Sequence, residues 1–365
     1  MLVKFAVTNY RGFEDTIELD LGRPREYEFN SFAIRNSVVK NGIIYGPNGC
    51  GKSNLGLAIF DIVNHLSQKW KRPDYYANFV FAGATTRPVA FLYVFHLGED
   101  TLEYTYSKDK SGQLLEESLV VNSKEIFNRK TNSFAIDASF PMDDVIKRNL
   151  ENNANKVSII NFILTSYPLP ENHYLVNLQK FVNSMLWFKN LDERSFIGLE
   201  THGTELNDYI IKNNLVKDFA AFLEKVSGQH FDFVPPNRGD KMLQCSIKGS
   251  PVLFNSIIST GTNALLLLYY WIQRMDEASF VFIDEFDAFY HFKLAYEVCN
   301  LLFKKDCQVL LSSHNTYLMT NDLLRPDCNF ILDKNRIKPL CDCTEKDLRF
   351  GHNIEKLFRG DTFIV

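Results

Sequence analysis

Residues 46–53 are the part of the chain whose residue types and spacing point most directly to chemistry. They read Gly-Pro-Asn-Gly-Cys-Gly-Lys-Ser and fit the phosphate-binding pattern G-x-x-x-x-G-K-[ST]. The glycines let consecutive backbone N–H groups curve around a polyphosphate, and a helix that begins there adds the positive end of its dipole. Lys52 would then reach the β- and γ-phosphates, and Ser53 would offer its hydroxyl to Mg²⁺. The alternative is a glycine-rich turn that matches by chance.

The segments on either side supply the strand–loop–helix context that the pattern requires. Residues 42–45 are short and apolar enough for a buried strand, and apolar residues recur at helical spacing after the loop, at Leu55, Ile59, Ile62 and Leu66. The residues that we expect to bind ATP in this segment are Gly46, Pro47, Asn48, Gly49, Cys50, Gly51, Lys52, Ser53 and Asn54. A lowered thiol pKa would make Cys50 sensitive to alkylation at this place, and the alternative is a tolerated small residue.

A second group of polar residues follows a continuous apolar run at 280–283, which is typical of a parallel strand covered on both faces. The run ends in Asp284 and Glu285, at the edge where ligands of open α/β sheets bind. Asp284 can complete the Mg²⁺ shell opposite Ser53, and Glu285 can orient or deprotonate the attacking water. By itself, an apolar run that ends in Asp-Glu would fit a surface loop equally well.

Another apolar run, at 309–311, leads into Ser312-Ser313-His314-Asn315. Because His314 comes just after a strand expected beside the Asp-Glu strand, it could donate a hydrogen bond to the γ-phosphate. The alternative is an ordinary loop histidine. We predict Lys52, Glu285 and His314 as the catalytic residues.

Between the loop and these strands, residues 259–262 read Ser-Thr-Gly-Thr and open a strongly apolar helix that runs to Met275. Ser and Gly are good capping residues, so the segment is consistent with a plain helix start. In ATP-binding-cassette ATPases, a Ser-x-Gly signature occupies this position and points at the γ-phosphate held by a second subunit. The match of order and spacing implies the same role for Ser259, Thr260 and Gly261.

With these motifs in place, the chain resembles the cassette ATPases related to the SMC, RecF and OLD proteins, and more narrowly the bacterial AAA-type or AbiL-like ATPases of phage-defence operons. The resemblance covers most of the chain, from the N-terminal residues 3–13, similar to an opening strand and N-[FY]-R-x-F turn, to the closing residues 349–357. It implies that Arg11 of that turn contacts the nucleotide. The glutamine of the usual Q-loop has no clear counterpart, so the lateral contact to Mg²⁺ or water stays unassigned.

The predicted fold class is α/β, a phosphate-loop NTPase of the cassette-head type with a mixed central sheet. Residues 1–140 form an N-terminal lobe with the phosphate loop and antiparallel β-structure, including a hairpin from residues 91–97 and 102–106. Residues 141–235 read as a helical insertion, and residues 236–365 complete the ATPase core.

Composition and net charge indicate which location and which partners to expect for this chain. At 365 residues and 45% hydrophobic, the chain can bury a large core, and its longest apolar run, residues 264–272, is too short to cross a bilayer. Seven irregularly spaced cysteines suggest reduced thiols and therefore a cytoplasmic location. Because the longest apolar run is short, we also expect no membrane partner. The net charge of −4 does not favour nucleic acid, although a nucleic-acid partner stays open.

These observations predict an ATPase that dimerises around ATP and Mg²⁺ and hydrolyses ATP to switch its assembly state. A homodimer or higher homo-oligomer is expected. The acidic residues after His314 form no recognisable metal-binding set, so we expect any damaging chemistry to belong to a protein effector that this ATPase senses or regulates in anti-phage defence. Two alternatives remain: a DNA-repair ATPase that clamps DNA, and a non-catalytic scaffold stabilised by ATP.

Overall fold

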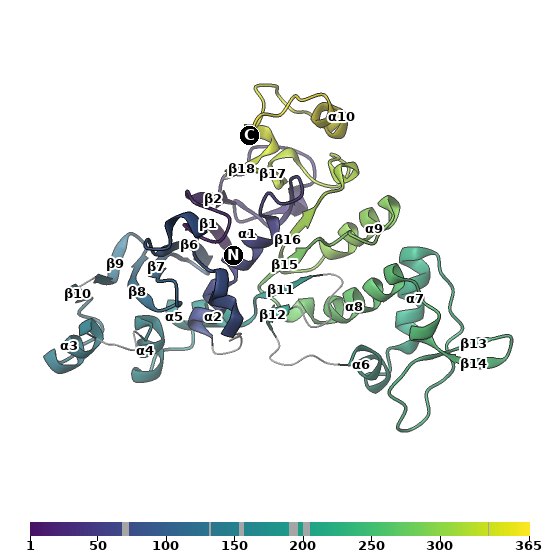
Figure 1. The fold of residues 1–365 in the computed structure, drawn as a ribbon, viewed down its shortest axis with the longest axis horizontal. Helices are drawn as coiled ribbons and strands as arrows, with labels where there is room; N and C mark the ends of the chain where they lie inside the picture. Colours follow the sequence, from purple (N-terminus) through teal and green to yellow (C-terminus); the bar gives the residue numbers. More distant parts are fainter. Residues whose placement is uncertain (68–72, 131–132, 153–156, 190–195, 200–204, 335) are drawn as a thin grey trace.

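The computed structural model describes residues 1–67, 73–130, 133–152, 157–189, 196–199, 205–334 and 336–365. Two large sheets form its framework, one antiparallel and built by the N-terminal part of the chain, the other mostly parallel and central (Figure 1). Gln308 joins them, because its side chain pairs with both the N–H and the carbonyl of Leu2 at 2.9 Å. Among the helices in the described residues, none has the length and apolar character that crossing a bilayer requires.

The N-terminal sheet has the strand order β10-β9-β8-β7-β6-β1-β2, and every neighbouring pair is antiparallel. The predicted hairpin is confirmed: β6 and β7 pair from Val89↔Lys108 to Leu97↔Asp100, with Gly98 in the turn at φ 67°. Alternate residues of β6 face the core, as the period of a strand requires. The strands are β1 (Leu2–Thr8), β2 (Ile17–Asp20), β6 (Val89–Leu97), β7 (Asp100–Lys108), β8 (Leu114–Val121), β9 (Lys124–Lys130) and β10 (Ser133–Ile136).

The central sheet has the order β12-β11-β15-β16-β5-β17-β18, with parallel pairs from β11 to β17 and an antiparallel strand at each edge. Its inner strands are buried on both faces, which explains their unbroken apolar runs. The strands are β5 (Asn41–Tyr45), β11 (Leu186–Lys189), β12 (Phe196–Gly198), β15 (Phe280–Asp284), β16 (Gln308–Ser313), β17 (Asn329–Asp333) and β18 (Arg336–Pro339). The predicted α/β class with a mixed central sheet is confirmed.

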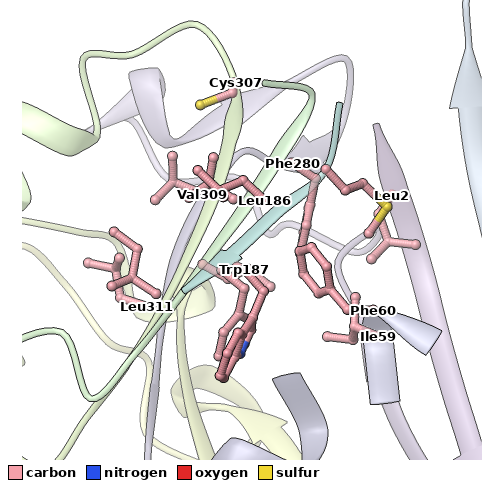
Figure 2. Packing of buried hydrophobic residues seen from close by; sticks show 14 of the residues in the cluster. Leu2, Ile59, Phe60, Leu186, Trp187, Phe280, Cys307, Val309 and Leu311 are labelled. Carbon is pink, nitrogen blue, oxygen red and sulfur yellow. The ribbon is translucent and has the colours of Figure 1, made fainter. Parts of the chain in front are cut away.

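The helix expected after the phosphate loop is interrupted once. Helix α1 (Lys52–Ile59) ends before Phe60, and α2 (Asp61–Leu66) begins directly after it. Phe60 packs against Phe280 of β15 with ring centroids 5.8 Å apart, in the core that Figure 2 shows. The break lets Asp61 point into the N-terminal sheet, where its carboxylate accepts a hydrogen bond from Lys108 at 2.6 Å. A hydrophobic repeat alone does not reveal such a break.

Residues 141–235 contain the expected helices and two strands that periodicity did not indicate. The helices are α3 (Asp144–Asn152), α4 (Ile159–Ser166), α5 (Tyr174–Asn183), α6 (Leu206–Lys212) and α7 (Val216–Ser227). Strands β11 and β12 belong to the central sheet, which therefore takes strands from all three predicted domains. The domain boundaries stay a prediction.

The remaining elements come mostly from the C-terminal part of the chain. Helices α6 and α7 pack on α8 (Thr260–Arg274), and this group lies beside the β13–β14 hairpin at one end of the molecule, with β8–β10 at the other (Figure 1). The other elements are β3 (Ile34–Arg35), β4 (Val38–Val39), β13 (Gln244–Ile247), β14 (Ser250–Leu253), α9 (Phe292–Leu302) and α10 (Ile354–Arg359).

A polar group is enclosed between α2, the N-terminal sheet and the start of α4. His65 stacks on Tyr106 at 4.2 Å, and its Nε2 lies 2.7 Å from the Tyr104 hydroxyl. Tyr104 in turn donates to Glu117, whose other carboxylate oxygen pairs with Arg129 at 3.0 Å. Burial, reinforced by the cations nearby, lowers the pKa of His65 well below 6.5, so the folded protein holds this ring neutral.

Acidification should therefore destabilise the protein through His65. The unfolded chain binds a proton near pH 6.5 that the folded chain does not, so stability present above that pH is lost as pH falls, by up to about 1.4 kcal/mol per pH unit. We expect wild type to lose more unfolding free energy than His65→Gln between pH 7.5 and 5.5, measured by urea denaturation. Equal losses in the two proteins would show that this ring does not carry the pH dependence.

Candidate nucleotide-binding site

The predicted site residues meet because four neighbouring parallel strands end at one edge of the central sheet. In the order β11, β15, β16 and β5, these strands end at Lys189, Asp284, Ser313 and Tyr45. The phosphate loop follows β5, Glu285 follows β15 and His314 follows β16, so motifs far apart in sequence come together at the carboxyl edge.

The loop itself has the form that an anion site needs. Gly51 has φ 106°, and a Cβ there would lie 2.6 Å from the Phe13 ring, so a larger residue would not fit. Gly46 is equally confined, against the carbonyl of Leu332. Helix α1 begins at Lys52 without a side-chain cap, which leaves its first N–H groups directed at the loop.

Lys52 and His314 lie side by side at this loop. The Lys52 ammonium donates to the carbonyls of Gly46 at 2.8 Å and Pro47 at 3.1 Å, and it lies 3.3 Å from Nδ1 of His314. Burial lowers the pKa of Lys52, and burial followed by the charge of Lys52 lowers the pKa of His314. A neutral His314 can accept from the ammonium at Nδ1 and donate from its other ring nitrogen. The two residues for which the sequence suggested contacts with phosphate therefore lie beside one another, and those contacts stay predictions.

The prediction of a reactive Cys50 is wrong. Burial raises the pKa of its thiol, and this outweighs the opposing effect of the nearby Lys52 ammonium. Cys50 is a small, partly buried residue of the loop, which was the alternative interpretation.

The Asp-Glu pair is fixed by a residue that sequence reasoning passed over. Ser312 of β16 donates its hydroxyl to Asp284 at 2.7 Å and accepts the N–H of Glu285 at 2.8 Å. Asp284 is 1% exposed, and Glu285 has the uncommon φ of 48°. One serine on the neighbouring strand thus holds the buried carboxylate and the turn that follows it.

Lys189 is a second residue that the sequence did not single out. Its ammonium lies 2.9 Å from the carboxylate of Glu285, and Lys189 pairs with Asp284 in the register of β11 and β15. The short apolar run Leu186–Phe188 is the signal that could have marked this strand, but it lay in a stretch interpreted as helical. The side of the Asp-Glu pair opposite β16 is therefore occupied by a lysine.

Ser259 has the capping role that its residue type suggested. Its hydroxyl accepts the N–H of Thr262 at 3.2 Å, and a Cβ on Gly261 would lie 3.0 Å from the carbonyl of Phe289, in the loop after Glu285. Ser259 and Thr260 are exposed, at the start of a helix that ends before β15. Within the described residues, no hydrogen bond joins Ser259 to the phosphate loop of its own chain, and its approach to a phosphate stays a prediction.

Arg11 lies in a turn that packs against the phosphate loop. Gly12 is in contact distance of Asn54, where an added Cβ would lie 3.3 Å from the side-chain amide, and Phe13 covers Gly51. Arg11 has φ 49° and donates from its backbone to the carbonyl of Phe79 at 3.0 Å. The turn that the resemblance implied therefore adjoins the loop, and its contact with nucleotide stays a prediction.

The residues present fit ATP and Mg²⁺. The confined glycines and the uncapped start of α1 suit a polyphosphate, and the donor set suits a hard cation, because Ser53 offers a hydroxyl and Asp284 a carboxylate. Asp284 and Glu285 also act on the pKa of Lys52 in the direction opposite to burial, as nearby anions do. The candidate site thus combines an anion cradle, the Lys52 ammonium beside His314, and two carboxylates.

Comparisons with known proteins agree with this architecture. A family model described as "AAA domain, putative AbiEii toxin, Type IV TA system" matches residues 43–320. Among curated proteins, none matches the chain.

Solved structures with a similar arrangement include an SMC head domain from Thermotoga maritima, at 14% identity and a TM-score of 0.45, covering 93% of this chain and 98% of that one. An Smc head bound to the C-terminal domain of ScpA from Pyrococcus furiosus is 16% identical, with a TM-score of 0.44 and coverage of 92% and 95%. The recombination mediator RecF with ATP is 13% identical, with a TM-score of 0.40 and coverage of 93% and 99%.

The family match runs from β5 through the phosphate loop, the Asp-Glu strand and His314, which is more than half of the chain. It confirms the predicted resemblance to AAA-type phosphate-loop ATPases, and the chain belongs to the ATPase-domain family described as "AAA domain, putative AbiEii toxin, Type IV TA system".

Proposed function

We propose that this protein binds ATP with Mg²⁺ at the phosphate loop and hydrolyses it between two copies of the chain, and that the change of assembly regulates a protein effector. The observation that carries the proposal is the convergence of Lys52, His314 and the Asp284–Glu285 pair on one sheet edge, with Lys52 and His314 only 3.3 Å apart. Negative charge develops on the phosphoryl group in the transition state, and this edge holds Lys52 and His314, which can stabilise that charge.

Each residue has a distinct part in this mechanism. The loop N–H groups and Lys52 hold the phosphates and spread their charge. Ser53 and Asp284 would hold Mg²⁺, which when bound neutralises charge on the β- and γ-phosphates. Glu285 orients the attacking water and accepts its proton, and His314 donates to the γ-phosphate. The two hydrogen bonds of Ser312 hold Asp284 and the backbone of Glu285 in place, so that each carboxylate can perform its own role.

The exposed start of α8 is the part of the chain that we expect to contact the nucleotide of a second copy. Ser259 and Thr260 lie open at the tip of a helix, and a helix start of this kind attracts a phosphate. If the tip of one copy covers the loop of the other, the γ-phosphate becomes part of the interface, and nucleotide state becomes assembly state. The family description, which names a toxin–antitoxin system, supports a protein effector as the partner that reads this state.

Lys52→Ala should weaken ATP binding by tenfold or more, because a charge-assisted contact to phosphate contributes about 1.5–3 kcal/mol. The measurement is a titration with a fluorescent ATP analogue in the presence of Mg²⁺. Lys40→Ala is the matched control, because Lys40 is also buried and precedes the same strand at its opposite end, where it donates to the carbonyl of Phe303. Equal affinities in Lys52→Ala and wild type would remove Lys52 from the site.

Glu285→Gln should slow ATP turnover by about 10²–10⁴-fold and leave an ATP-bound dimer, since an amide cannot accept the proton of water. Steady-state hydrolysis and light scattering with ATP and Mg²⁺ report the two effects. The substitution also breaks the ion pair with Lys189, so Lys189→Met is the control that breaks the pair and keeps the carboxylate. A matching loss in Lys189→Met would mean that the ion pair, and not proton transfer, explains the result.

The composite site can be tested at Ser259 with two substitutions that both preserve the helix cap. Asn and Asp cap helices about equally well, but only Asp places a negative charge beside a phosphate. We expect Ser259→Asp to lose ATP-dependent dimerisation and turnover, and Ser259→Asn to retain most of both. Mixing Ser259→Asp with Lys52→Ala should restore turnover, because a mixed dimer has one intact composite site. Two inactive proteins that stay inactive when mixed would contradict a shared site.

A further inference from the structure

Beyond the end of the helix that follows the phosphate loop lies a buried carboxylate that the proposed chemistry does not use. Asp61, the first residue of α2, is 0% exposed. One of its oxygens accepts from the Tyr75 hydroxyl at 3.2 Å, and the other accepts from the Tyr106 hydroxyl at 2.8 Å and from Lys108 at 2.6 Å. A buried charge with this many partners is a rigid anchor, because any movement would leave polar groups unpaired.

Tyr75 extends this anchor to the N-terminal turn. Its hydroxyl lies 3.2 Å from the hydroxyl of Tyr10, and both side chains are buried, at 4% and 0% exposed. The guanidinium of Arg11 lies over both rings, 5.6 Å from the centroid of Tyr10 and 5.5 Å from that of Tyr75. It also donates to the backbone carbonyl of Tyr75 at 3.4 Å. Two aromatic faces and one carbonyl therefore fix the plane of the guanidinium.

The same turn is pressed against the phosphate loop from the other side, through Phe13 on Gly51 and Gly12 on Asn54. Arg11 is only partly buried, and its Nε is enclosed without a hydrogen-bond partner among the described residues. The contacts of Arg11 with the Tyr75 carbonyl and the Tyr10 side chain use only part of the five N–H donors of a guanidinium. The remaining donors belong to a side chain that is held in place beside an anion cradle.

We propose that Asp61, Tyr75 and Tyr10 are positioning residues that hold Arg11 toward the phosphates of the bound nucleotide. This inference rests on the proposed function, since it needs a nucleotide in the phosphate loop. Asp61 holds the Tyr75 hydroxyl by a hydrogen bond, and Tyr75 holds the Tyr10 hydroxyl in the same way. The guanidinium of Arg11 packs on the two rings. Arg11 then meets a phosphate without a further loss of side-chain freedom, so the network acts on nucleotide affinity.

Tyr75→Phe tests the network, because it removes the hydroxyl that joins Asp61 to Tyr10 and keeps the ring under Arg11. The matched control is Tyr93→Phe: Tyr93 is also 0% exposed, and its hydroxyl donates to the carbonyl of Ala58 at 3.1 Å and lies 3.3 Å from that of Tyr106, so its loss keeps the hydrogen bonds that join Asp61, Tyr75 and Tyr10. ATP affinity, KM, kcat and melting temperature are measured for both. We expect Tyr75→Phe to weaken ATP binding about threefold to tenfold, as loss of one buried hydrogen bond would, with the loss in KM rather than kcat. Tyr93→Phe should melt earlier to a similar extent and bind ATP as wild type does.

Two further variants separate this inference from the function on which it rests. Arg11→Ala should weaken binding at least as much as Tyr75→Phe, and the double variant should bind no more weakly than Arg11→Ala alone, because the network acts through Arg11. If Arg11→Ala weakens binding but Tyr75→Phe behaves as Tyr93→Phe does, or if the double variant shows additive losses, the positioning role is wrong and the nucleotide site stands. If Arg11→Ala binds as wild type while Lys52→Ala fails, Arg11 is not a ligand and the inference fails. If Lys52→Ala also binds normally, the proposed function fails as well.

Discussion

The parallel pairing of β11, β15, β16 and β5 is the constraint on which the site depends. Side chains and loops that follow these strands can only emerge at one edge, so the pairing decides that a lysine, a carboxylate pair, a histidine and a glycine loop become neighbours. Their burial holds the strands together, because separating them would expose apolar side chains that are enclosed on both faces. The hydrophobic core of the sheet is thus what sets the geometry of the polar edge.

Positively and negatively charged side chains lie close together at that edge. The cation of Lys52 lies beside a histidine whose pKa is lowered, and the carboxylates of Asp284 and Glu285 lie between Ser312 on one side and Lys189 on the other. Lys52 donates to the carbonyls of Gly46 and Pro47, and Lys189 pairs with the carboxylate of Glu285, so each lysine contacts an acceptor. Such an arrangement gives several ionisable groups that lie close together partners of opposite charge or hydrogen-bond acceptors, and it leaves the glycine loop open to an anionic ligand.

Much of this could be read from the sequence, and the reasons for the exceptions are physical. The phosphate loop, the Asp-Glu strand and the β6–β7 hairpin follow from local patterns, and the structure contains all three. The break at Phe60 could not be predicted, because the apolar repeat continues across it and the contact of Asp61 with Lys108 that accompanies it is long-range. β11 was missed because four residues are too few to show a period.

Ser312 illustrates a different limit of sequence reasoning. It looked like one small polar residue before His314, and its importance comes from two hydrogen bonds across a strand pair that only the fold creates. The raised pKa of Cys50 is a similar case. The loop suggested an activated thiol, whereas enclosure by neighbouring residues decides the outcome, and enclosure is a property of tertiary structure.

The place of β5 in the sheet has a consequence for how the protein comes into being. Both strands that flank it, β16 and β17, are made from the last part of the chain, and the carbonyl that confines Gly46 belongs to Leu332. During synthesis the glycine loop emerges early, yet β16, β17 and the Leu332 carbonyl can pack against it only after more than two hundred further residues have left the ribosome. A nascent chain that ends before β16 therefore carries the motif without the strands that enclose it.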